Sequence, residues 1–272
     1  MTTATTPASR SGSFLWEGRR LAYEEFGEGD RVLLYMHGIL MDSEMNRDPA
    51  RALAARGHRV VLLDLLGHGQ SDKPTHASEY RMDTYAHQVA ACLDHLGVEE
   101  AVIGGVSLGA NVALQVAVRA PGRVTALVLE MPVLEWAVPA AAMLFTPLVL
   151  GLHYAKPLFS AIAAVARRMP DTPIAAVNSA VRGFAASPDV LASILHGVLV
   201  GPVAPSADER AQIKAPTLVI AHKRDFIHPF SDAENLVGQL PDAELVSAHS
   251  QAELRLFPER LTAEIAGFLD RV

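Results

Sequence analysis

Short, continuous apolar runs alternate with helix-like patterns along most of the chain, and this alternation restricts the fold more than any other feature. Strands that are apolar at every position suit a sheet covered on both faces, and intervening helices connect such strands in parallel. The expected strands are 14–16, 21–26, 32–36, 60–64, 101–106, 124–130, 217–221 and 244–247. The expected helices are 49–56, 82–96, 108–120, 231–239 and 258–269. The sequence therefore predicts an α/β fold with a mostly parallel central sheet flanked by helices.

The alternation stops between residues 132 and 207, where the composition is helical and prolines are frequent. A structureless loop of that length is improbable inside a compact domain, so we interpret the segment as an inserted helical cap. The core then consists of residues 13–131 and 208–272. Residues 1–12 are mostly Thr, Ser, Ala and Pro, lack the apolar stretch of a signal peptide, and are expected to form a disordered tail.

Composition excludes several classes of protein. Half of the residues are hydrophobic, which rules out a fully disordered chain, and a formal net charge of −7 argues against a nucleic-acid binder. The single cysteine, Cys92, cannot form an intramolecular disulfide, and a cytoplasmic location is expected. Residues 136–152 are almost entirely apolar, but Pro139 and Pro147 would interrupt a membrane helix. We therefore expect no stable membrane span there; contact of the cap with a membrane surface is left open.

The strongest local signal for chemistry is Gly105-Val106-Ser107-Leu108-Gly109. This G-x-S-x-G pattern follows a predicted strand and opens a predicted helix, which is the context of a nucleophile elbow. Glycines on both sides allow a sharp turn that lifts the serine hydroxyl above the sheet edge. The turn also places the Leu108 N–H at a helix N-terminus, where a developing oxyanion is favoured.

Further motifs follow in order along the chain. They are His37-Gly38, the loop Asp64-Leu65-Leu66-Gly67-His68-Gly69-Gln70-Ser71, the Ser107 elbow, Asp225 with Pro229, and His249. With these motifs the sequence resembles the α/β-hydrolase superfamily, in the serine-nucleophile branch that carries a helical cap. The resemblance implies an α/β-hydrolase fold and an esterase-like or lipase-like activity, and it does not specify the substrate.

A serine hydroxyl needs a base, and the base needs an orienting acid. The resemblance places the base at His249, after the last predicted strand, although Ala248 stands where the family usually has glycine. It places the acid at Asp225, which gives the expected chain order Ser, Asp, His. Glu130, at the end of an earlier strand, is the alternative acid. His222 and His228 flank the acid and are interpreted as loop residues.

An oxyanion hole requires two N–H donors. The elbow geometry supplies the Leu108 N–H, and the resemblance implies the Ile39 N–H, with Leu40 as the alternative donor. No metal site is expected, because the histidines are scattered and one cysteine cannot build a zinc site. No dinucleotide-binding fingerprint is present, so no cofactor is expected.

We therefore expect a cofactor-free serine hydrolase that cleaves a carboxylic ester of a small, uncharged, hydrophobic substrate through an acyl-enzyme. A lactonase, a carbon–carbon (diketone) hydrolase and a cofactor-free perhydrolase are alternatives on the same triad. A hydrophobic-ligand receptor without catalytic activity is a further alternative from another class. The expected partner is the small hydrophobic substrate, with no nucleic acid, and the expected assembly is a monomer or homodimer.

Overall fold

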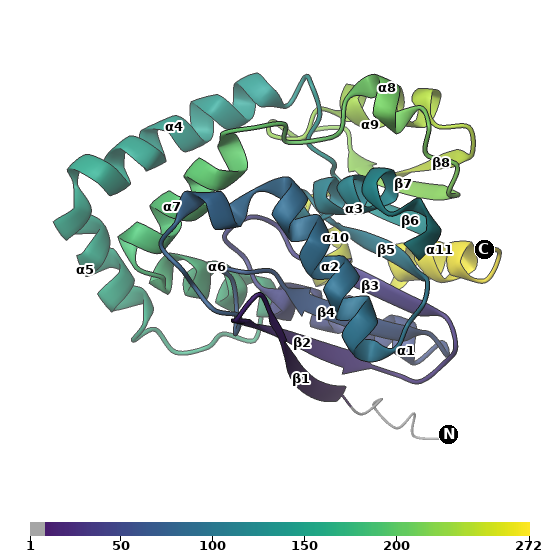
Figure 1. The fold of residues 1–272 in the computed structure, drawn as a ribbon, viewed down its shortest axis with the longest axis horizontal. Helices are drawn as coiled ribbons and strands as arrows, with labels where there is room; N and C mark the ends of the chain where they lie inside the picture. The colour runs from purple at the N-terminus through teal and green to yellow at the C-terminus, as the bar shows by residue number, and fades with distance from the viewer. Residues whose placement is uncertain (1–8) are drawn as a thin grey trace.

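The computed structural model describes residues 9–272, and an eight-stranded sheet forms its centre (Figure 1). The strand order is β1-β2-β4-β3-β5-β6-β7-β8. The strands are β1 (Ser9–Trp16), β2 (Arg19–Phe26), β3 (Val32–Met36), β4 (Arg59–Asp64), β5 (Ala101–Val106), β6 (Val124–Glu130), β7 (Thr217–His222) and β8 (Ala243–Ala248). β1 and β2 pair antiparallel with each other, and β2 pairs antiparallel with β4, whereas all pairs from β4 to β8 are parallel. The predicted fold class is confirmed.

The beginning of the chain differs from the expected tail. Residues 1–8 lie outside the described residues, but Ser9 to Gly12 form the first half of β1, paired with β2 from Phe26 to Tyr23. This segment is largely exposed and polar, so it has no apolar pattern from which a strand is predicted. Backbone pairing with the neighbouring strand defines it instead.

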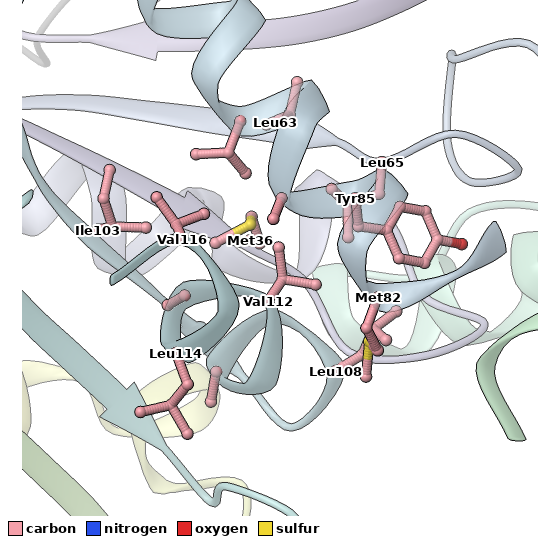
Figure 2. Packing of buried hydrophobic residues seen from close by; sticks show 14 of the residues in the cluster. Met36, Leu63, Leu65, Met82, Tyr85, Ile103, Leu108, Val112, Leu114 and Val116 are labelled. Carbon is pink, nitrogen blue, oxygen red and sulfur yellow. The ribbon is translucent and has the colours of Figure 1, made fainter. Parts of the chain in front are cut away.

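Helices cover both faces of the sheet, because most of its strands are apolar on both sides. On one face, α2 (Met82–Leu96) and α3 (Leu108–Arg119) pack on the strands. Figure 2 shows Val116 of α3 beside Met36 and Ile103, and Tyr85 of α2 beside Leu65. The other face is covered by α1 (Arg47–Ala54), α10 (Glu253–Leu256) and α11 (Glu259–Leu269). The helix α9 (Phe230–Gln239) packs beside β7 and β8. This close packing fixes the strand ends from which the site is built.

Between β6 and β7 the chain forms α4 (Val138–Tyr154), α5 (Lys156–Ala166), α6 (Ala175–Ala185), α7 (Pro188–Leu199) and the short α8 (Ala207–Arg210). We call residues 132–207 the helical insertion; its helices α4 to α7 lie together beside the sheet domain (Figure 1). The buried carboxylate of Asp232 on α9 accepts hydrogen bonds from the N–H groups of Leu134, Trp136 and Ala137. This contact attaches the start of the insertion to the core.

A second attachment lies at α6. The Arg182 guanidinium forms ion pairs with Asp42, Glu44 and Asp171, and Ser179 accepts the N–H of Asp42 at 2.7 Å. Burial raises the pKa of the Asp42 carboxyl, but hydrogen bonds from Arg182 and Ser179 outweigh it and hold that pKa below its usual value. The insertion is therefore held to the core by charged as well as apolar contacts.

Candidate active site

Ser107 lies between β5 and α3 on a strained turn. Its φ of 53° and ψ of −109° are rare for a residue with a side chain. A Cβ at Gly105 would lie 2.5 Å from the backbone of Gly109, and a Cβ at Gly109 would lie 2.6 Å from the carbonyl oxygen of Met36. Both glycines are thus required for the turn to pack. The Ser107 N–H donates to the Glu130 carbonyl at 2.8 Å, which ties the turn to β6.

A histidine and an aspartate reach Ser107 from one loop, between β7 and α9. His228 Nε2 lies 3.0 Å from Ser107 Oγ, and His228 Nδ1 lies 2.9 Å from Asp225 Oδ2. The other carboxylate oxygen of Asp225 accepts the N–H groups of Ile227 and His228 at 2.8 and 2.9 Å. The Asp225 carboxylate therefore stabilises the turn of the loop and also orients the imidazole of His228.

The environment of Asp225 favours its charged form. Its side chain is fully buried, which raises its pKa, but hydrogen bonds from the side chain and backbone of His228 outweigh burial and lower that pKa below its usual value. An ionised carboxylate at this point holds the proton of His228 on Nδ1. The Nε2 atom is then free to accept a proton from Ser107.

The structure corrects the expected partner of Ser107. The imidazole of His249 is 78% exposed, and its Nδ1 lies 3.6 Å from Glu253 Oε1. Within residues 9–272, the histidine that hydrogen-bonds to Ser107 and Asp225 is His228. The His249 N–H also donates to the Glu253 carboxylate, which is bound by Arg260. These contacts hold the imidazole of His249 at the surface. His228, interpreted from the sequence as a loop residue beside the acid, is the histidine that contacts Ser107. Its spacing of three residues from Asp225 was a usable signal for a shared turn.

Glu130, the alternative acid, is engaged in a different buried network. Its carboxylate accepts a hydrogen bond from the Tyr35 hydroxyl at 2.8 Å and forms an ion pair with Arg255, which also donates to Asn46 at 2.8 Å. Burial and the Glu130 charge raise the pKa of Tyr35 well above its usual value. With both oxygens occupied, Glu130 does not orient a histidine. It links β6 to α10.

The two expected oxyanion donors belong to residues that border the same space as Ser107. Ile39 and Leu108 both line the cavity described below, and the Leu108 N–H belongs to the first residue of α3. Leu40 is excluded as the alternative donor, because its N–H donates to His68 Nε2 at 3.3 Å. The geometry is thus compatible with the expected pair, Leu108 and Ile39, as oxyanion donors.

His37 and His68 shape the loop that carries Ile39. The His37 ring accepts the Leu65 N–H at 3.1 Å, and its centroid lies 4.6 Å from that of His68. Burial lowers the pKa of His68 well below its usual value, so the neutral ring can accept the Leu40 N–H. These two histidines therefore connect the loops after β3 and β4, and neither contacts Ser107 through a hydrogen bond in residues 9–272.

The loop after β4 closes on itself. One Asp64 oxygen accepts the Gln70 N–H at 2.8 Å, and the other accepts the Ser43 N–H at 2.7 Å. Gly69 has φ 47°, and a Cβ there would lie 2.0 Å from the Asp64 carboxylate. This explains why the D-x-x-G-x-G-x-S pattern needs a glycine at this position. The loop supports the floor of the site without supplying a reactive group.

A cavity of about 540 Å³ opens above Ser107, between the sheet domain and the helical insertion. Residues from both parts line it: Gly38, Ile39, Met41, Met45, Met82, Val106, Ser107, Leu108, Asn111, Met131, Val133, Val138, Ala141, Ala142, Phe145, Thr146, Val198, Leu199, Val203, Ile227, His228 and Gln251. None of them is Asp, Glu, Lys or Arg. The cavity therefore suits an apolar, uncharged ligand.

Few polar groups remain available to a ligand in this cavity. The Asn111 side chain is saturated by the backbone of Val133 and Val203. Of the cations near the insertion, Lys156 pairs with Asp189 and Arg182 pairs with Asp42, and neither lines the cavity. The remaining polar side chains of the lining are Ser107 and His228 at the serine turn, and Thr146 and Gln251.

A buried strand, a strained serine turn and a histidine–aspartate loop at the ends of parallel strands define an α/β-hydrolase. The chain has the α/β-hydrolase fold, and the model of a family described as "alpha/beta hydrolase fold" matches residues 31–150. Within residues 9–272 no group of three or more His, Cys, Asp or Glu is arranged to hold a metal ion.

Known proteins are similar to the chain over different lengths. The AB hydrolase superfamily protein YisY of Bacillus subtilis (strain 168) is 29% identical over 83% of this chain and 85% of its own length. A non-heme haloperoxidase from Rhodococcus erythropolis is 35% identical, but over only 42% of this chain and 40% of its own. The crystal structure of a hydrolase from Pseudomonas aeruginosa PA01 gives a TM-score of 0.77 at 25% identity, covering 95% of this chain and 98% of that chain.

Proposed function

We propose that the protein is a serine hydrolase that cleaves carboxylic esters of small, uncharged, apolar substrates. The observation that carries this proposal is the hydrogen-bonded series Ser107–His228–Asp225 at the floor of a cavity without charged side chains. The fold and the enzyme relatives support a hydrolase, and the site suggests the chemistry. The proposed base is His228 in place of His249.

The proposed reaction begins when the Ser107 hydroxyl attacks the ester carbonyl and His228 Nε2 takes its proton. Asp225 stabilises the resulting imidazolium through Nδ1. The N–H groups of Leu108 and Ile39 stabilise the negative charge on the former carbonyl oxygen. His228 then returns the proton to the alcohol oxygen as the carbon–oxygen bond breaks, leaving an acyl-enzyme.

Water completes the cycle in the same geometry. His228 removes a proton from water as its oxygen attacks the acyl carbon, and it returns the proton to Ser107 Oγ as the free acid departs. The apolar cavity favours longer acyl or alkyl groups, because burial of each CH₂ contributes about 0.8 kcal/mol. We therefore expect kcat/KM to rise severalfold for every two carbons until the cavity is filled.

The direct test combines labelling with a substrate series. A fluorophosphonate probe should label the purified protein at Ser107, and Ser107→Ala should remove both labelling and turnover of p-nitrophenyl esters. Ser160→Ala, which removes an exposed serine on α5, is the matched control and should retain both. Absence of labelling in folded protein would overturn the proposal. A preference for succinyl monoesters over neutral esters would overturn its substrate class.

The similarity to a non-heme haloperoxidase favours one second candidate, a cofactor-free perhydrolase. Here hydrogen peroxide replaces water in the second step, and its attack on the acyl-enzyme releases a peracid. The same ester assay, repeated with hydrogen peroxide and a peracid-sensitive dye, separates the two activities. Peracid formation faster than acid formation would support the second candidate.

A further inference from the structure

The outer surface of α4 and α5 is unusually apolar. Across this surface and its two ends, nine large apolar side chains are substantially exposed: Trp136, Met143, Leu144, Leu150, Tyr154, Leu158, Ile162, Val165 and Met169. Met143 is 71% and Tyr154 80% exposed. In Figure 1 both helices form the outer edge of the molecule, away from the sheet. So many exposed large apolar side chains on two consecutive helices indicate an interaction site.

The helix α4 is apolar on two opposite faces. Val138, Ala141 and Phe145 line the cavity above Ser107, whereas Met143, Leu150 and Tyr154 are exposed, at spacings of seven and four residues. A helix that is apolar all round is normally buried on all sides. The inner face of α4 lines the cavity. The outer face is exposed and has no apolar partner within residues 9–272.

The charged residues within the segment that forms this surface have one sign. From Trp136 to Pro170 the chain contains no Asp or Glu, but it contains Lys156, Arg167 and Arg168, in a protein whose formal net charge is −7. The acids nearest in sequence, Glu135 and Asp171, are paired with Arg210 and Arg182. The apolar surface is therefore bordered by positive charge.

Arg167 and Arg168 carry most of this positive charge. Lys156 is paired with Asp189, but within the described residues the two arginines donate only to backbone carbonyls, those of Ala185 and Ala164. Both arginines are exposed. Their guanidinium groups are available to phosphate groups, to which arginine binds well.

The lengths of α4 and α5 and the bend between them favour helices that lie along a membrane surface over helices that cross a membrane. In the described chain, no helix is by itself long and apolar enough to cross a membrane, and α4 and α5 pass such a test only as a pair that is bent by 102°. Apolar side chains, flanking aromatic residues and basic groups without acids are the features of helices that lie in a membrane interface. Trp136 and Tyr154 lie near the two ends of α4.

We propose that the outer surface of α4 and α5 docks on the surface of an anionic lipid bilayer. The apolar side chains enter the interface, and Arg167 and Arg168 bind lipid phosphates. Because α4 separates this surface from the cavity, docking brings the cavity next to apolar molecules dissolved in the bilayer. This last consequence rests on the proposed function, whereas docking itself does not.

Tryptophan fluorescence gives a direct test, since the chain has only two tryptophans. In a Trp16→Phe variant the remaining emission comes from Trp136, which is 67% exposed. Vesicles of phosphatidylcholine containing phosphatidylglycerol should shift this emission to shorter wavelength and co-float with the protein. Vesicles of phosphatidylcholine alone should bind much more weakly, and added salt should weaken binding.

Two variants separate the apolar and the charged contributions. Met143→Gln combined with Leu150→Gln keeps good helix formers, and Arg167→Glu combined with Arg168→Glu reverses the charge. Each pair should weaken vesicle binding by more than about tenfold. Leu15→Gln removes an equally exposed apolar side chain on β1 and should leave binding unchanged.

The outcomes distinguish docking from its alternatives. Equal binding of all variants, or no binding of the wild type to anionic vesicles, would overturn the proposal. So would a wild-type dimer in gel filtration that Met143→Gln with Leu150→Gln converts to monomer while vesicles do not bind, because the surface would then cover a second copy. Vesicle binding of Ser107→Ala tests docking without catalysis, and turnover of a soluble acetyl ester tests catalysis without docking.

Discussion

His228 Nε2 lies 3.0 Å from Ser107 Oγ, and His228 also hydrogen-bonds to Asp225, only three residues earlier in the same loop. The proposed base and acid therefore move as one unit. The Asp225 carboxylate also accepts two N–H groups of that loop, so orientation of the imidazole and folding of the loop depend on the same side chain. Any change in this loop should act on the serine through His228.

The first prediction compares the two histidines. His228→Ala should lower kcat for p-nitrophenyl butyrate by roughly 10⁴-fold or more, because Ser107 loses its base. His249→Ala is the matched control, and it should leave kcat near the wild-type value since the His249 side chain is exposed and pairs with Glu253. Circular dichroism checks that both variants fold. The reverse pattern would return the role of base to His249.

The second prediction concerns the acid. Asp225→Asn should reduce kcat by about 10⁴-fold, because the amide no longer holds the proton of His228 on Nδ1. Glu130→Gln should instead act on stability. It leaves Arg255 buried without its anion, and the loss of a buried partner costs about 3–5 kcal/mol in free energy of unfolding.

Steady-state rates and urea unfolding on both variants separate these effects. If Glu130→Gln stayed as stable as wild type but lost turnover, Glu130 would be the acid and the assignment of Asp225 would fail.

The third prediction concerns pH and the attachment of the helical insertion. The pKa of Asp42 is lower in the folded protein than its ordinary value of 3.8, because Arg182 and Ser179 bind the ionised form. The folded state thus binds fewer protons, so this stabilisation is present above about pH 3.8 and is lost as the pH falls through the lower, folded pKa.

Arg182→Ala should therefore lower the free energy of unfolding by about 1 kcal/mol at neutral pH and by less in acid, because a protonated Asp42 has no ion pair to lose. Urea unfolding of wild type and variant, at neutral pH and in acid, measures this difference in free energy of unfolding. Lys156→Ala, which breaks an exposed pair with Asp189, is the control and should have little effect at either pH. If the loss of unfolding free energy in Arg182→Ala grew toward low pH, the ion pair between Arg182 and ionised Asp42 would not be its cause.

The sheet and its main helices were predictable, because their signals are local. Residues 32–36, 101–106 and 124–130 are continuous apolar runs, and the structure gives β3, β5 and β6 the same bounds. The helix at 82–96 ends as expected because Gly97 adopts the left-handed conformation that terminates it. By contrast, the first half of β1 is polar and exists through pairing with β2.

The partner of the serine was not predictable in the same way. Ser107 and His228 are separated by 121 positions, so their contact depends on the path of the loop after β7. The three-residue spacing from Asp225 to His228 indicates a shared turn, but it does not indicate where the turn points. Likewise, His249 follows β8 as expected, and its contact with Glu253 turns it to solvent.

The last prediction tests the cavity as the determinant of chain length. Ala141 on α4 is 9% exposed and lines the cavity, so Ala141→Phe should fill part of the space that longer acyl chains occupy. Turnover of acetyl esters should change little, whereas kcat/KM for octanoyl esters should fall by about tenfold or more, since burial of two CH₂ groups contributes roughly 1.6 kcal/mol. Ala161→Phe adds the same side chain at an exposed position on α5, and it should preserve the profile. Initial rates across the acetyl-to-octanoyl series measure both variants. An equal loss for every chain length in Ala141→Phe would mean that the helix, and not the volume of the cavity, had been disturbed.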